Sequence, residues 1–178
     1  MSRQLPEPDH DCDRVGTRRR QWAKELPDVD THGMAVLGRA RLITLAVRPQ
    51  IEAVFARHGL DTGEFDTLAT LLRSGHPYRL RPTELFSSLM ISSGGLTDRL
   101  TRLQRAGLIC RPPAASDARS LPVQLTEEGK RVAEAAFRED MAVEAHLLEG
   151  MSRADLIRLS DLLEKLALSI EATAAADK

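Results

Sequence analysis

Seven arginines are concentrated in the middle of the chain, and their side chains could contact phosphates or the edges of bases. Residues 79–119 hold these seven arginines against three acidic residues, a net charge of +4, whereas the whole chain of 178 residues carries −1. A basic segment within an otherwise acidic chain is typical of a DNA-reading module on a larger scaffold. Charge alone is equally compatible with an arginine-rich face that only meets solvent.

The elements expected around these arginines follow a recognisable order. Apolar periodicity and turn residues predict a helix over 62–73, a short helix over 82–89, a helix over 92–107, and two strands over 108–111 and 121–125. Helix, short helix, helix and hairpin make a winged helix-turn-helix, in which one helix enters the major groove of DNA. We therefore expect a mainly α fold with a small two- to three-stranded β-wing.

The third predicted helix of this unit has an apolar stripe and a polar face. Leu96, Leu100 and Leu103 recur at helical spacing, so the opposite face is free for DNA. The two glycines at 94–95 cost roughly 2 kcal/mol of helix stability, which a close approach of the backbone to DNA would explain. We expect DNA contacts from this helix and from an arginine at the wing tip: Ser92, Ser93, Gly94, Thr97, Asp98, Thr101, Arg102, Arg105 and Arg119.

Helical patterns flank the predicted winged unit on both sides. The long N-terminal helix should run to about His58 and bend at Pro49. These flanking helices are rich in Leu and Ala and would form a dimer, whose two-fold symmetry matches a palindromic DNA site. The expected organisation is a disordered tail over 1–16, N-terminal dimerisation and ligand-pocket helices over 17–60, the DNA-binding domain over 61–125, and C-terminal dimerisation helices over 126–178.

Other functional classes have weaker support in the sequence. Five scattered histidines accompany no HExxH, GxSxG, P-loop or glycine-rich fingerprint, so we expect no enzyme, no metal site and no cofactor. No apolar run approaches 18 residues and two cysteines make no disulfide framework, which indicates a reduced, cytoplasmic protein. A redox sensor is an alternative: Cys12 lies in the predicted tail, and Cys110 adjoins Arg111, which would favour its thiolate.

Several short motifs together resemble those of the MarR family of bacterial transcription regulators over about residues 30–172. The stretches that carry the resemblance are Pro82–Leu85, Ser92–Thr97, Arg102–Ile109, Asp117–Arg119 and Leu125–Gly129. The resemblance implies that the long first helix and the last two helices of two chains intertwine into a homodimer. It also implies a ligand-responsive DNA-binding regulator, most often a repressor, acting on a pseudo-palindromic operator.

A narrower resemblance concerns the PecS/HucR-like, urate-responsive group of that family. Members carry a tryptophan on an extra N-terminal helix, an aspartate on the second helix, an arginine on the recognition helix and an arginine at the start of the wing. The matching residues here are Trp22, Asp66, Arg99 and Arg111, and the stretch 74–80 is also typical of the group. The resemblance implies that these four residues bind a small anion such as urate or a related purine or carboxylate.

The chemistry of such a site is plausible by itself. Arginine offers a planar fork to an anion, and Trp22 would stack on a flat ring. Asp66 would be repelled by the anion or would need a proton, and if it otherwise pairs with Arg99, ligand binding would shift the recognition helix. Plainer interpretations stay open: a surface tryptophan, a structural Asp66–Arg99 pair, and Arg99 and Arg111 as phosphate contacts.

Overall fold

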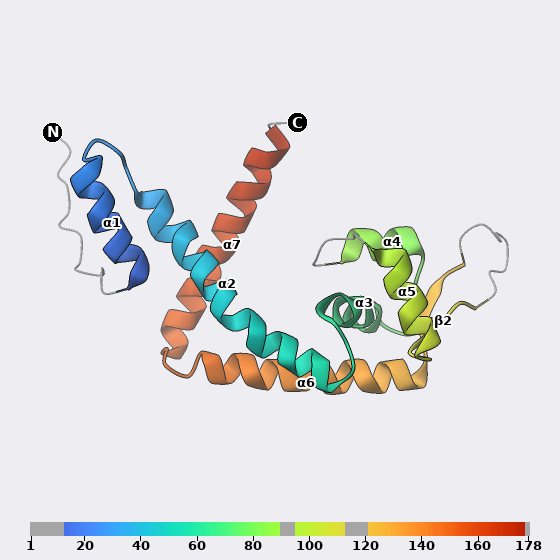
Figure 1. Cartoon of the computed structure of the whole chain (residues 1–178). Coiled ribbons are helices and arrows are strands. Elements are labelled where there is room, and N and C mark those ends of the chain that lie inside the picture. The colour runs from blue at the N-terminus through green and yellow to red at the C-terminus, as the bar shows by residue number, and fades with distance from the viewer. Residues whose placement is uncertain (1–12, 90–94, 113–120, 177–178) are drawn as a thin grey trace. The chain divides into compact units, whose positions relative to one another are not determined.

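The computed structural model in Figure 1 describes residues 13–89, 95–112 and 121–176. The chain forms two compact units, residues 1–53 and 54–178. Helix α2 (His32–Arg57) begins in the first unit and ends in the second, and it continues through Pro49. None of the helices in the described ranges is long and apolar enough to cross a membrane.

The first unit pairs helix α1 (Arg14–Glu25) with the start of α2. Asp13 caps α1, because its Oδ1 accepts a hydrogen bond of 2.7 Å from the backbone N–H of Gly16. Arg39 of α2 donates to both oxygens of the same carboxylate, at 2.9 and 3.1 Å, and so ties the two helices together. The hydrogen bond from Arg39 lowers the pKa of Asp13 below its ordinary value.

This cap corrects the expected boundary of the N-terminal tail. The tail was predicted over residues 1–16 and the helix from residue 17, but the helix begins at Arg14. Val15 is buried, and its methyl groups lie beside the Cα of Gly38 in α2. The residues around Asp13 show no apolar period, so the sequence alone does not predict this first turn. The turn is held by contacts with Arg39 and Gly38 of α2.

The second unit contains the remaining helices and a small sheet, which confirms the expected mainly α fold with a β-wing. In chain order the elements are α3 (Thr62–Arg73), β1 (Arg79–Leu80), α4 (Pro82–Ser88), α5 (Leu96–Arg105), β2 (Ile109–Cys110), β3 (Val123–Leu125), α6 (Glu127–Leu147) and α7 (Arg153–Ala176). The sheet is antiparallel in the order β1-β3-β2, with Arg79 opposite Gln124 and Ile109 opposite Leu125. Strand β1 was not expected from the sequence.

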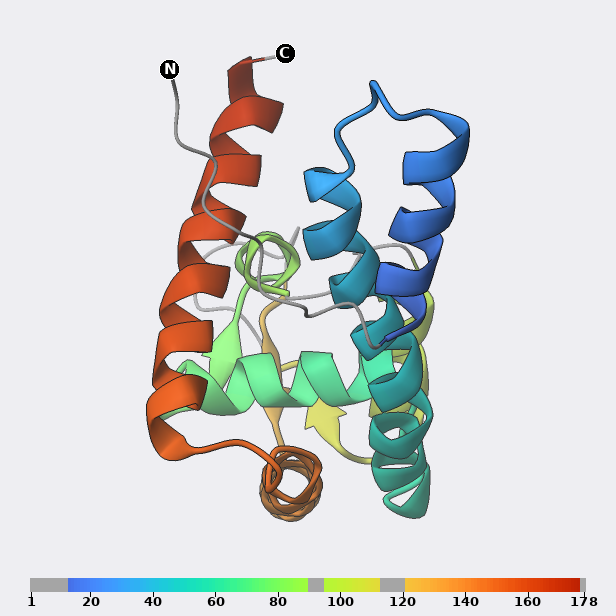
Figure 2. The ribbon, with the colours of Figure 1, turned by 90° about the vertical axis from the view of Figure 1, so that its left-hand side faces the viewer.

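Helix α3 is the central element of this unit. Leu68 and Leu71 are fully buried, and α3 packs against α4, α5, β3 and α6. Figure 2 looks along α6, which is seen end-on beneath α3. The face of α6 toward this core is lined by small residues at helical spacing, including Ala133 and Ala136, so the two helices approach closely.

The wing is fixed to the start of α6 by backbone contacts. Thr126 donates its backbone N–H to the carbonyl of Leu108 at 3.1 Å and its hydroxyl to the carbonyl of Gly107 at 2.7 Å. A Cβ on Gly129 would lie 1.8 Å from the Leu108 carbonyl oxygen, so only glycine fits there. The stretch Leu125–Gly129 therefore has a structural reason for its composition.

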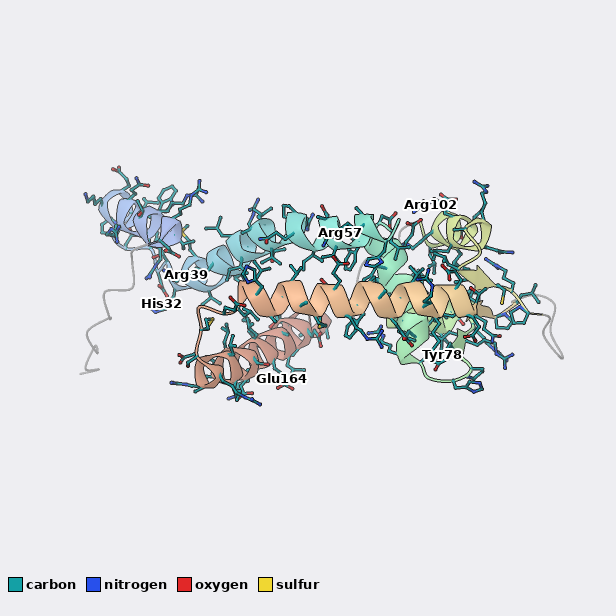
Figure 3. The ribbon with its side chains drawn as sticks, turned by 90° about the horizontal axis from the view of Figure 1, so that it is seen from below. His32, Arg39, Arg57, Tyr78, Arg102 and Glu164 are labelled. Carbon is teal, nitrogen blue, oxygen red and sulfur yellow. The ribbon has the colours of Figure 1, made fainter. Side chains whose placement is uncertain are left out.

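A second junction joins the end of α2 to α6. Glu139 accepts a hydrogen bond of 2.8 Å from Nε of Arg57, and its other oxygen lies 2.7 Å from Nε2 of His58. Figure 3 labels Arg57 beside α6. The Arg57 hydrogen bond, followed by that of His58, lowers the pKa of Glu139. The end of α2 is thus anchored to the winged unit by charge.

One buried carboxyl in α6 lacks such compensation. Asp140 is 5 % exposed, and among the described residues its Oδ1 has no hydrogen-bond partner. Burial, reinforced by the negative charge of Glu144, raises the pKa of Asp140 from 3.8 to about 6. The folded state therefore binds this proton more tightly than the unfolded state.

The pH dependence of stability follows from this proton. The contribution of Asp140 is fully present below its unfolded pKa of 3.8 and is lost as the pH rises through about 6. Asp140→Asn should therefore raise the free energy of unfolding at pH 8 by about 1–2 kcal/mol and flatten its pH dependence between about pH 4 and 6. Urea unfolding at fixed protein concentration measures both.

Glu144→Gln is the companion variant, because it removes only the smaller cause of the shift. It should change stability in the same direction by less. Wild-type and Asp140→Asn curves that run parallel across this pH range would show that the carboxyl titrates normally.

Candidate DNA interface and ligand site

Helix α5 divides into a buried side and an exposed side, as the sequence predicts. Leu100 and Leu103 are buried and Leu96 is half-buried. The predicted DNA contacts on the other side are exposed: Thr97, Asp98, Thr101, Arg102 and Arg105. Ser92, Ser93, Gly94 and Arg119 lie outside the described residues. All of these DNA contacts remain predictions.

The start of α5 differs from the prediction. The helix begins at Leu96, and Gly95 caps it with a φ of 72°. This left-handed conformation is strained for residues with a Cβ, so the turn requires a glycine. Gly95 therefore weakens no helical turn, and its presence needs no close approach of DNA.

Arg99 lies on the buried side of α5, which the apolar stripe did not predict. It is 8 % exposed, and its guanidinium covers the Cα of Gly63 in α3. A Cβ on Gly63 would lie 2.5 Å from Nε and Nη2 of Arg99. Arg99 is therefore part of the packing between the two helices and does not belong to the exposed face.

Asp66 lies one turn after Gly63 and is also buried. Residues at this spacing share a helix face. The structure thus buries two of the four predicted ligand residues, Asp66 on α3 and Arg99 on α5, within the second unit. Arg111 is half-buried directly after β2 in the same unit.

Trp22 lies in the first unit, on α1. Its side chain is 46 % exposed and lines a hollow of about 300 Å³ at the turn between α1 and α2. The other lining residues are mostly apolar: Leu26, Val29, Asp30, Thr31, Gly33 and Met34. Trp22 thus has a pocket within its own unit, whereas a pocket that joins it to Asp66, Arg99 and Arg111 stays a prediction.

Arg102, at the edge of the exposed face of α5, is held by two carboxylates of α3. Its Nε donates to Oε1 of Glu64 and its Nη2 donates to Oδ2 of Asp61, both at 2.7 Å. The hydrogen bond with Glu64 is the main cause that raises the pKa of Arg102. Figure 3 labels Arg102 where α5 lies.

The same two acids form the cap of α3. Asp61 accepts from the backbone N–H of Glu64 at 2.7 Å, and Glu64 Oε2 accepts from the backbone N–H of Asp61 at 2.9 Å. The helix begins at Thr62, as the sequence predicts, but the role of these acids was not predicted. The spacing Asp-x-x-Glu at a helix start would have predicted the capping box; the link to Arg102 has no local signal.

A second hollow of about 440 Å³ lies between α4 and α5. Its lining combines the start of α4 with the start of α5: Pro82, Thr83, Phe86, Gly95, Leu96, Thr97 and Asp98. Phe86 is largely exposed there. The surface around the predicted DNA contacts is therefore concave and partly apolar.

The cysteines and the possible metal ligands were the candidates for a redox or metal site. Cys110 is exposed in β2, and Cys12 lies outside the described residues. Among the described residues no three His, Cys, Asp or Glu side chains gather as metal ligands would.

Comparisons with known proteins agree with this geometry, although no family model matches the chain. The regulator PecS of Dickeya dadantii is 36% identical over 146 residues, which are 82% of this chain and 88% of PecS. The repressor Rv2887 of Mycobacterium tuberculosis, solved as a MarR family protein with salicylic acid, has 29% identity, covers 79% of this chain and 99% of its own, and gives a TM-score of 0.59. NadR, solved with 4-hydroxyphenylacetate, has 25% identity, a TM-score of 0.60 and coverage of 80% and 98%.

A three-stranded sheet behind an exposed helix, on a scaffold of long helices, defines a winged helix-turn-helix DNA-binding regulator. The particular family follows from the relatives: the chain belongs to the MarR family of transcriptional regulators and is PecS-like.

The contact between Gly63 and Arg99 gives a test of the α3–α5 packing. Gly63→Ala should displace the Arg99 guanidinium and lower the free energy of unfolding by about 1–3 kcal/mol. Gly33→Ala is the matched control in a helix, because a Cβ there meets nothing within 4 Å. It should be neutral or slightly stabilising.

The identity of the clashing side chain is tested in the Arg99→Ala background, where Gly63→Ala should cost much less. An equal cost in both backgrounds would mean that Arg99 does not occupy the space beside Gly63. Thermal or urea unfolding is measured for the wild type, the two single variants, the double variant and the Gly33→Ala control.

Proposed function

We propose that this chain is a homodimeric repressor that binds a pseudo-palindromic operator and is released by a small anion such as urate or a related purine or carboxylate. The observation that carries the proposal is the two-sided α5. Leu100, Leu103 and Arg99 are buried, Arg99 against Gly63 of α3. The polar residues of the other side remain exposed: Thr97, Asp98, Thr101, Arg102 and Arg105. Such a helix can enter a major groove without loss of packing. A regulator of this kind acts in the cytoplasm and catalyses no reaction.

Exposed apolar side chains on the long helices support a dimer. None of the residues of α7, all of which are described, is buried. Large apolar side chains on α7 are instead exposed: Ile157, Leu159, Leu162, Leu163, Leu168 and Ile170. Val36, Leu37, Ile43 and Leu45 of α2 are also exposed. So many large apolar side chains exposed on two long helices are typical of an interface between subunits.

Sedimentation tests the dimer. The chain has a mass of 19.7 kDa, so a species of about twice that mass is expected at micromolar concentration. Replacing Leu162 and Ile170 together by glutamate should shift the equilibrium to the monomer, because charges would enter the apolar contact. Arg158→Glu is the control on the same helix, and a stable wild-type monomer would refute the dimer.

The ligand proposal rests on the chemistry of the four residues. Trp22 lines an apolar hollow that suits a flat ring. Arg99 and Arg111 supply positive charge, and Asp66 supplies a carboxylate that an anion would disturb. The relatives Rv2887 and NadR were solved with salicylic acid and 4-hydroxyphenylacetate, which are aromatic carboxylates. A ligand that favours one conformation over the other shifts DNA binding, and tenfold release needs about 1.4 kcal/mol of coupling.

A mobility shift on the DNA upstream of the chain's own gene, with urate, xanthine, aconitate and salicylate titrated in, tests this function. Trp22 is the single tryptophan, so its emission reports ligand binding directly. Trp22→Phe should lower the affinity for the ligand and leave the affinity for DNA unchanged. Asp66→Asn should bind DNA but respond less to the ligand, since the repelled charge is absent.

Two results would count against the proposal in different ways. No shift of any upstream DNA would refute operator binding. A DNA complex and an emission spectrum that both stay unchanged at millimolar concentrations of all four compounds would refute the ligand class and the role of the four residues.

A further inference from the structure

The cluster formed by Arg102, Glu64 and Asp61 lies at the edge of the face that α5 presents to DNA. Arg102 comes from α5 and is about half exposed, whereas Glu64 and Asp61 come from the start of α3. The two hydrogen bonds occupy Nε and Nη2 of the guanidinium, both at 2.7 Å. Among the described residues, no hydrogen bond engages Nη1, so the outer end of the fork is left for a DNA acceptor.

Glu64 is held more firmly than a surface carboxylate. Its side chain is 12% exposed, and its two oxygens have different partners: Oε1 accepts from Arg102, and Oε2 accepts from the backbone N–H of Asp61. The helix cap therefore fixes Glu64, and Glu64 fixes Arg102. The loss of side-chain freedom that an arginine suffers when it binds DNA has already occurred in the folded protein.

The charge of the cluster determines which part of DNA it accepts. Two carboxylates and one guanidinium carry a formal net charge of −1. A phosphate at Arg102 would meet both carboxylates at short range, and the repulsion would oppose the contact. A guanine edge presents two neutral acceptors, O6 and N7, which can accept from the N–H groups of Nη1 and from the second N–H of Nη2. An arginine held from behind by acids therefore favours bases over the backbone.

We propose that Asp61 and Glu64 are specificity-determining residues, which orient Arg102 toward a base edge and prevent it from contributing to sequence-independent phosphate binding. The inference rests on DNA binding through α5. It assigns a role in discrimination to two acids of α3, outside the exposed face of α5. Neither Asp61 nor Glu64 needs to touch DNA, so both are positioning residues.

Conservative variants test the role without disturbing the helix. Asp61→Asn keeps a good N-cap, and Glu64→Gln keeps an acceptor for the capping box. Binding of each is measured by fluorescence anisotropy at several salt concentrations, with two duplexes of equal length. One is the upstream DNA that the wild type binds, and the other has a mixed sequence. Circular dichroism confirms that each variant is folded.

Loss of either carboxylate should release Arg102 to a phosphate. Affinity for the mixed duplex should rise about three- to tenfold, and the slope of log affinity against log salt should steepen by about 0.9, the value for one phosphate. The ratio between the two duplexes should fall about tenfold. Arg102→Ala should lower affinity for the specific duplex about tenfold or more and leave the mixed duplex and its salt slope unchanged.

Two controls separate this effect from a general change of charge. Glu134→Gln removes a carboxylate that pairs with Arg138 on α6 and should leave the salt slope unchanged. In the Arg102→Ala background, Asp61→Asn and Glu64→Gln should also have no effect on the slope. An equal rise in the Glu134→Gln control, or a rise without Arg102, would overturn the proposal.

Other results would also overturn the proposed role of Asp61 and Glu64. If the carboxylate variants change neither duplex, or weaken both equally at an unchanged slope, the cluster is only structural. If Arg102→Ala itself lowers the slope by one phosphate, Arg102 is a backbone contact and the proposal is wrong. The wild type serves as the reference for the proposed function: if it binds no DNA, that function fails, whereas failure of the variants alone overturns only the role of Asp61 and Glu64.

Discussion

The contact between α3 and α5 is the constraint on which the DNA-binding unit depends. One side of α5 must be buried to hold the helix in place, while the other side must stay exposed to solvent. Leucines alone would achieve this, yet the buried side also carries Arg99, whose guanidinium lies on a glycine of α3. The guanidinium on Gly63 fixes the distance between the two helices. A larger residue at 63 would clash with it, and a shorter residue at 99 would leave the space empty.

Charge on the two sides of α5 has different roles. Arg99 is buried with its guanidinium against Gly63, so its position depends on the packing of α3. Arg102, one turn further along, is exposed and held by Glu64 and Asp61. Both arginines are thus connected to the same helix. A change in α3 would reach α5 through two separate contacts, which gives a physical route for the proposed effect of a ligand on DNA binding.

The ends of two helices are held by specific contacts inside the second unit. Glu139 anchors the last turn of α2 through Arg57 and His58, and Gly129 brings α6 against the backbone of the wing. Helix α6 therefore contacts both the last turn of α2 and the sheet. The orientation of the wing relative to α6 is set by backbone atoms, which allow less adjustment than side chains do.

The sequence alone determined the order of the helices, the fold class and the polar face of α5, because apolar periodicity and capping residues are local signals. It also singled out Trp22, Asp66, Arg99 and Arg111, although only through resemblance to a family. The tertiary structure decided the rest. Strand β1 is two residues long and exists because β3 pairs with it. Arg102 and Glu64 are separated by 38 residues in the chain. Their contact arises only once α3 and α5 are packed, and no pattern of neighbouring residues encodes it.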